Sequence, residues 1–94
     1  MEKQTLTYRD LETVLVDLGF TRRTENSHII YEIPEKRALI PLPALSPDAP
    51  LLPRHYMAAR ILVENAGIAD ERDFEQAMRQ HGELPKGVPP VTMK

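Results

Sequence analysis

The stretch NSHIIYEI, residues 26–33, decides the fold that the sequence predicts, because a polar run gives way there to alternating apolar residues. Successive side chains of a strand point to opposite faces of the sheet. The alternation therefore gives one mixed face and one apolar face: His28, Ile30 and Glu32 on the first, and Ile29, Tyr31 and Ile33 on the second. We expect residues 28–33 to form the central strand of a small sheet, with His28 presented at its edge.

Two further strands are predicted beside this one. The polar segment Thr21–Glu25 has little to bury, which is typical of a partly exposed first strand. Pro34 suits the start of a tight turn after the central strand. The returning strand then has an apolar face made of Ala38, Ile40 and Leu42. Because Pro41 cannot donate a hydrogen bond to a neighbouring strand, we expect the returning strand at an edge of the sheet.

A helix is predicted before the sheet, over residues 7–18. Thr7 is a suitable N-cap residue, and Asp10 places negative charge in the first turn, near the positive end of the helix dipole. Gly19 is placed to end the helix in the left-handed conformation. The apolar residues recur at the spacing of one buried helix face: Leu11, Val14, Leu15 and Leu18.

The chain after Pro43 is predicted to contain a long extended connection and then two helices. Prolines at positions 43, 47, 50 and 53 exclude a regular helix between them. One helix is expected at about Arg54–Ala66, and Asp70 is expected to cap another. The predicted buried faces of these two helices are Met57, Ile61 and Leu62 in the first, and Phe74, Ala77 and Met78 in the second.

These elements predict a single α+β domain over residues 1–82, in the order αβββαα, with a three-stranded antiparallel sheet packed against the helices. The segment 83–94 contains three prolines and is expected to be an irregular tail. The length of 94 residues suits one domain with one core.

Composition limits the function classes. The chain has no cysteine, which excludes disulfides, thiolate metal sites and a thiol nucleophile, and fits a reducing cytoplasmic environment. No apolar run approaches the roughly 20 residues of a membrane span, so we expect a soluble protein without a membrane partner. The three histidines are too widely spaced for a local metal motif, and no glycine-rich phosphate loop is present, so we predict no metal and no cofactor.

His28 is the candidate for catalysis, with Ser27 beside it. The ordinary pKa of histidine, roughly 6.5, lets one side chain accept and donate a proton near neutral pH, as cleavage of a phosphodiester without metal requires. The alternative is a partly exposed histidine with a structural role only.

Charge is unevenly distributed along the chain. The formal net charge is −2, which argues against binding of nucleic acid by bulk charge. Residues 21–60 nevertheless carry an excess of two positive charges. Within that segment Arg22, Arg23 and Arg37 are the candidates for contacts with RNA phosphates. The alternative is that these arginines are ordinary solvated surface residues.

The combined pattern resembles the HicA-type, or YcfA-like, toxin family over about Tyr8 to Met78. The features that carry the resemblance are a helix ending in Leu18-Gly19-Phe20, an arginine-rich first strand, Ser27-His28 opening the second strand, a third strand ending in proline, and helices at the C-terminal end. The family usually has Gly-Ser-His where this chain has Asn26-Ser27-His28. Asparagine tolerates a left-handed backbone better than most residues, so we expect the turn to be kept.

The resemblance implies a fold like that of a double-stranded-RNA-binding domain (dsRBD) and a messenger-RNA interferase activity, a ribonuclease neutralised by a HicB antitoxin. It implies that His28 is the catalytic residue, with Ser27 next to it. The implied partners are messenger RNA and a HicB-like antitoxin. Separately, the proline-rich connection from Pro43 to Pro53 and the proline-bearing tail suggest contact with another chain, either a second copy in a homo-oligomer or an antitoxin. Two alternatives stay open: a non-catalytic protein- or RNA-binding module of the same fold, and a homo-oligomeric structural protein that uses the proline-rich segments as contacts.

Overall fold

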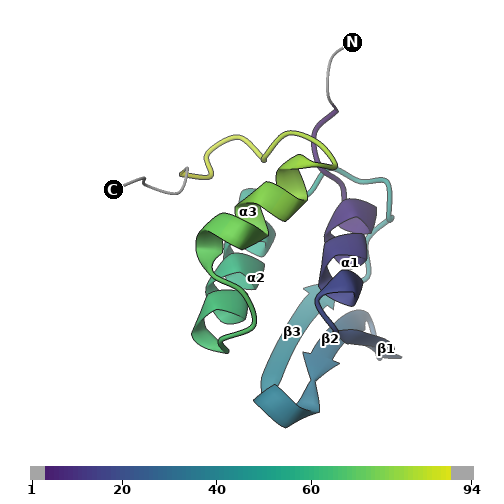
Figure 1. Ribbon diagram of the computed structural model, residues 1–94. Coiled ribbons are helices and arrows are strands. Elements are labelled where there is room, and N and C mark those ends of the chain that lie inside the picture. The colour runs from purple at the N-terminus through teal and green to yellow at the C-terminus, as the bar shows by residue number, and fades with distance from the viewer. Residues whose placement is uncertain (1–3, 90–94) are drawn as a thin grey trace.

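The computed structural model describes residues 4–89 and confirms the predicted α+β architecture (Figure 1). The elements follow the expected order, with one 3₁₀ turn, η1, between the second and third strands. Their bounds are α1 (Tyr8–Asp17), β1 (Thr21–Glu25), β2 (His28–Ile33), η1 (Pro34–Lys36), β3 (Ala38–Pro43), α2 (Pro53–Asn65) and α3 (Glu71–Arg79).

The three strands form one antiparallel sheet in the order β1-β2-β3. In the register of this sheet, Ile30 of β2 lies between Arg23 of β1 and Pro41 of β3. Pro41 is therefore on an edge strand, as predicted. An edge position tolerates proline because the missing N–H is not needed by a further strand.

One face of the sheet is covered by helices and the other is open. Helices α1 and α2 lie over the sheet, and α3 packs against both helices (Figure 1). The covered face contributes Tyr31, Ile33 and Ile40 to the hydrophobic core. Ile30 faces the other way and stays outside the core cluster, although its neighbours on β1 and β3 leave it only 6% exposed.

The ends of α1 are fixed by the residues that the sequence singles out. The Thr7 hydroxyl accepts a hydrogen bond from the Asp10 backbone, and the Asp10 carboxylate accepts one from the Thr7 backbone at 2.9 Å, which makes a capping box. At the other end Gly19 has a φ of 106°, in the region where residues with a Cβ are strained. The Phe20 amide then donates to the Leu15 carbonyl, and both side chains are buried.

The predicted buried stripe of α2 is wrong. Met57 and Leu62 are only half-buried, and Ile61 is 49% exposed. The physical reason is that α2 has apolar residues around most of its circumference, so periodicity alone offers two stripes. The core takes the other stripe: Tyr56, Ala59, Arg60 and Val63.

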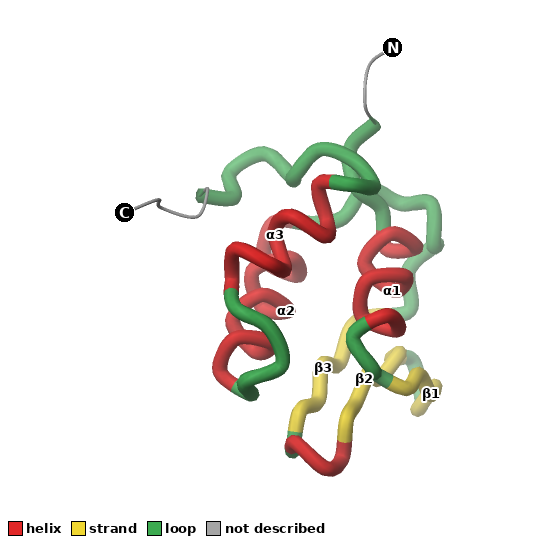
Figure 2. Tube along the Cα trace, in the orientation of Figure 1, coloured by secondary structure: helices red, strands yellow, loops and turns green. Residues whose placement is uncertain are grey.

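The connection between β3 and α2 is bound to the start of α1 (Figure 2). Its carbonyls accept hydrogen bonds from the Tyr8 and Arg9 amides, which have no partner within the first turn of α1. Leu51 is buried and its amide donates to the Leu6 carbonyl. The connection is therefore part of the folded domain and caps a helix.

Part of the predicted tail also packs on the domain. Glu83 forms a bridge with Thr5, and its carbonyl accepts from the Leu6 amide at 3.0 Å. The preceding Gly82 is buried, and a Cβ there would lie 2.5 Å from the Gln4 carbonyl oxygen, so only glycine fits this approach. Residues 83–89 contain no helix and no strand beyond this bridge, and residues 90–94 lie outside the described part.

A partly buried polar contact joins the starts of α1 and α2. The Tyr8 hydroxyl lies 2.7 Å from Nδ1 of His55 and accepts a hydrogen bond from the Leu52 amide. Burial, and secondly the charge of Arg54, lower the pKa of His55. The neutral imidazole is thus the form that folding favours.

This contact predicts a pH dependence of stability. A histidine with a lowered pKa in the folded state stabilises the fold above its ordinary pKa of roughly 6.5, and this stabilisation is lost as the pH falls through the folded-state value. At pH 8, His55→Gln should lower the free energy of unfolding by about 0.5–1.5 kcal/mol through the altered hydrogen bond. The difference from the parent should shrink toward pH 5. Urea titrations at several pH values measure it, and a constant difference would contradict the assignment.

Candidate functional site

The turn between β1 and β2 holds the Ser27-His28 motif in place. Asn26 has a φ of 56°, so it adopts the left-handed conformation that the sequence predicts for this position. The Ala44 amide donates to the Ser27 carbonyl at 3.1 Å, which ties the turn to the end of β3. The backbone that carries His28 is therefore fixed from both flanking strands.

His28 is the first residue of β2 and its side chain is exposed on the open face of the sheet. It lies opposite Glu25 of β1 and Pro43 of β3. Within residues 4–89, neither the imidazole of His28 nor the hydroxyl of Ser27 has a hydrogen-bond partner. Both side chains are exposed, and the imidazole of His28 is accessible to a molecule that approaches the open face.

Arg23 lies on the same face, diagonally opposite His28 in the register of β1 and β2. Such diagonal neighbours are roughly 7–8 Å apart, within reach of long side chains. The guanidinium donates to Glu32 at 2.6 Å and to Glu25 at 2.7 Å. The hydrogen bond to Glu32, followed by that to Glu25, raises the pKa of Arg23, so its charge is retained at any physiological pH.

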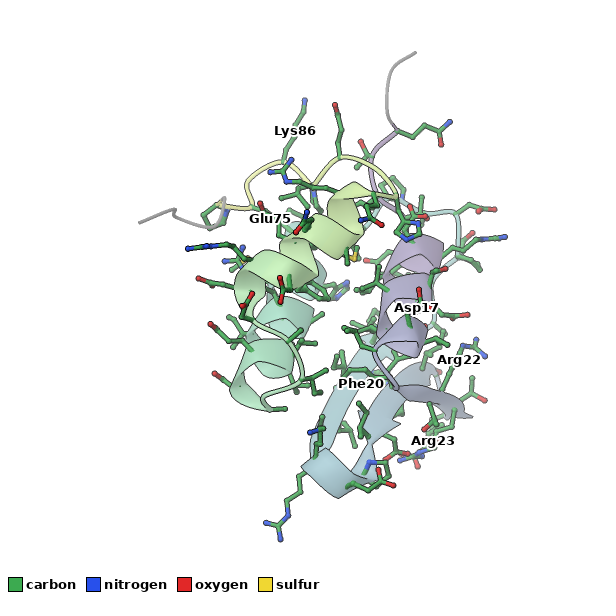
Figure 3. The ribbon with its side chains drawn as sticks, viewed as in Figure 1. Asp17, Phe20, Arg22, Arg23, Glu75 and Lys86 are labelled. Atoms are coloured by element: carbon green, nitrogen blue, oxygen red, sulfur yellow. The ribbon has the colours of Figure 1, made fainter. Side chains whose placement is uncertain are left out.

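Arg22 and Arg37 lie elsewhere. Arg22 lies on the α1 side of β1 and Arg23 on the opposite side (Figure 3), and Arg22 pairs with Glu12 of α1 at 3.1 Å. Arg37 follows η1 at the far end of β2, roughly 16 Å along the strand from His28 at about 3.3 Å per residue. The structure therefore brings His28, Ser27 and Arg23 together and leaves the other two arginines apart.

Arg22 borders a cavity of about 420 Å³ between α1, the covered face of the sheet and the proline-rich connection. Inside this cavity the Tyr31 hydroxyl donates to the Glu12 carboxylate at 2.8 Å. Burial, and secondly the bond to Glu12, raise the pKa of Tyr31, so this phenol stays protonated. The Glu12 carboxylate of α1 therefore binds both Arg22 and Tyr31, and these two contacts join α1 to the sheet.

Glu25 is the residue of this region that the sequence reasoning missed. Its place opposite His28 follows from counting back across the two-residue turn Asn26–Ser27. Glu25 therefore places a carboxylate opposite His28 in the pairing of the two strands. His28, Arg23 and Glu25 thus bring together an imidazole that can accept and donate a proton, a guanidinium and a carboxylate.

Within residues 4–89, no three potential ligands among His, Cys, Asp and Glu are positioned to share a metal ion. No helix of that part of the chain has both the length and the apolar character needed to cross a bilayer.

Comparisons of the chain with family models, with curated proteins and with solved structures find no match.

Proposed function

We propose that this chain is a HicA-like, metal-independent ribonuclease acting on messenger RNA, with His28 as its proton-transfer residue. The observation that carries the proposal is the exposed His28 on the open sheet face, held directly after a left-handed turn. The αβββαα order agrees with the fold that the family resemblance implies.

The chemistry that fits this arrangement is transesterification within RNA. The ribose 2′-oxygen attacks the neighbouring phosphorus, the bond from phosphorus to the 5′-oxygen of the next nucleotide breaks, and a 2′,3′-cyclic phosphate and a 5′-hydroxyl result. His28 takes the proton from the 2′-hydroxyl or supplies one to the leaving oxygen, and water exchanges the other. Arg23 supplies positive charge near the phosphate.

The second candidate is a non-catalytic protein- or RNA-binding module of the same fold. The observation that favours it is the pairing of Arg23 with Glu25 and Glu32, because these carboxylates add negative charge to the face that would meet phosphates. In this case a HicB-like antitoxin relative or a second copy of the chain would be the partner of the open face.

The test is an RNA cleavage assay with purified protein in the presence of EDTA, from pH 5 to pH 8. The proposal expects cleavage products that end in a cyclic phosphate. Expression in cells without an antitoxin should arrest growth. Intact RNA at every pH, together with normal growth, would favour the binding module.

Arg23→Ala should weaken RNA binding and lessen its salt dependence. Loss of one contact to a single-strand phosphate reduces the slope of log affinity against log salt by about 0.7. Arg22→Ala is the matched control, because Arg22 lies on the covered side of the same strand and should leave binding on the open face unchanged. Fluorescence anisotropy at several salt concentrations measures both slopes. Equal losses in the two variants would contradict the assignment of the open face.

A further inference from the structure

Helix α2 has a second stripe, mostly apolar, that the core covers only along one side, where Leu62 and Ala66 pack against it. Tyr56, Ala59 and Val63 face the core. The stripe on the other side follows the spacing i, i+3, i+4, i+7, i+8 of one helix face and consists of four apolar residues, Ala58, Ile61, Leu62 and Ala66, with the polar Asn65 among them. Ile61 in this stripe is 49% exposed. A surface helix normally has polar residues opposite its buried face, so this stripe is unusual.

The stripe forms one wall of a groove of about 480 Å³. The opposite wall is the corner where η1 meets β3, with Lys36, Arg37 and Ala38. The alanines at positions 58 and 66 leave room at either end of the larger Ile61 and Leu62. From residue 58 to residue 66 the stripe is about 12 Å long at 1.5 Å per residue, which matches two turns of a second helix.

Two cations border this apolar surface. Within residues 4–89, six cations have no carboxylate partner, namely Lys36, Arg37, Arg54, Arg60, Arg72 and Lys86, and of these only Lys36 and Arg37 line the groove. In a chain of net charge −2, unpaired cations at the edge of an apolar groove are complementary to an acidic molecule.

Arg37 adds a separate observation. Its φ is 54°, the left-handed region that residues with a Cβ rarely adopt. Glycine or asparagine would adopt this conformation with less strain. Arg37 is the C-cap of η1, and strained residues of this kind cluster at active sites, ligand clamps and switch regions. Arg37 lines the groove and lies at the far end of the sheet from His28.

We propose that this α2 groove is the docking site for a short acidic amphipathic helix of a partner protein. Apolar side chains of that helix fill the space over Ile61 and Leu62, and its carboxylates pair with Lys36 and Arg37. The site is separate from the open face of the sheet. The proposal therefore holds or fails independently of the ribonuclease.

The probe is a synthetic helical peptide of about four turns, with leucines at the spacing i, i+3, i+4, i+7 and glutamates at the flanking positions. The matched peptide has lysine in place of every glutamate. We expect the acidic peptide to bind the full chain and to shift the amide NMR signals of residues 36–38 and 58–66. The lysine peptide should bind at least about tenfold more weakly.

Three variants separate docking from folding. Ile61→Glu should weaken binding of the acidic peptide by at least about tenfold, because it places a negative charge in the groove that repels the glutamates of the peptide. Val16→Glu is its matched control, since Val16 on α1 is also 49% exposed and lies outside the groove. Arg37→Gly should weaken binding several-fold while the melting temperature stays unchanged or rises, because glycine relieves the left-handed strain.

Several results would overturn the proposal. These are equal affinity for the acidic and lysine peptides, signal shifts outside the groove, or no binding at millimolar peptide. Light scattering that shows a dimer of the parent and a monomer of Ile61→Glu would make a second copy the occupant. A short RNA that shifts residues 36–38 would make these cations part of the nucleic-acid surface.

Discussion

His28→Ala is expected to lose RNA cleavage by about 10²-fold or more while the fold persists. Removal of a general acid or base typically lowers a rate by 10²–10⁴-fold. His28 is exposed at the start of β2, and its imidazole contacts no other described residue by a hydrogen bond. Alanine at this position therefore leaves the core intact. Cleavage by parent and variant is measured in EDTA under single-turnover conditions, with unfolding by urea as the check on folding.

The matched control is His81→Ala, because His81 is likewise exposed and follows α3, away from the sheet. This variant should cleave RNA like the parent. In cells without an antitoxin, the parent and His81→Ala should both arrest growth, and His28→Ala should not. If His28→Ala retains full cleavage, the proton-transfer role of His28 fails even when the chain remains a ribonuclease.

The sheet and the first helix could be predicted because several local signals agree there. The capping residues Thr7 and Asp10 indicate the start of α1, Gly19 indicates its end, and the alternation of residues 28–33 indicates β2. The structure has all three features. Pro41 correctly indicated an edge strand. Proline has no backbone N–H to donate to a neighbouring strand, and a central strand needs its donors on both sides. Such local agreement makes a prediction secure.

The orientation of α2 could not be predicted because two of its faces are apolar. The core selects the face with Tyr56 and Val63, which are fully buried, and includes Arg60 at 7% exposure. The Arg60 guanidinium donates to the Pro89 carbonyl at 3.1 Å, a contact with a segment far along the chain. Helical periodicity contains no information about such a partner.

The candidate site was predictable in part, for a similar reason. The Ser27-His28 motif is local, so the sequence is enough to find it. Whether an arginine lies beside His28 depends on which face of β1 it occupies. Arg22 and Arg23 are adjacent in sequence, yet only Arg23 shares the open face. The positions of the arginines therefore require the register between β1 and β2.

Leu15→Ala should lower the free energy of unfolding by about 2–5 kcal/mol, the range for truncation of a fully buried leucine. Leu15 is 0% exposed and belongs to the core cluster that α1, the sheet and the other helices share. Its carbonyl also accepts from the Phe20 amide, so the cavity would lie beside the turn that leads into β1. Most domains have a total stability of only about 5–15 kcal/mol, so the predicted loss is a large share of it.

Val16→Ala is the matched control, since Val16 is the next residue of α1 and is 49% exposed. Exposed substitutions usually change stability by less than about 0.5 kcal/mol, and alanine favours a helix more than valine does. Urea unfolding of the three proteins should give a midpoint shift for Leu15→Ala only, at an unchanged slope. Equal midpoints for Leu15→Ala and Val16→Ala would mean that Leu15 does not hold α1 to the sheet. The fixed position of the Ser27-His28 turn depends on that packing, because β1 enters the sheet directly after Phe20.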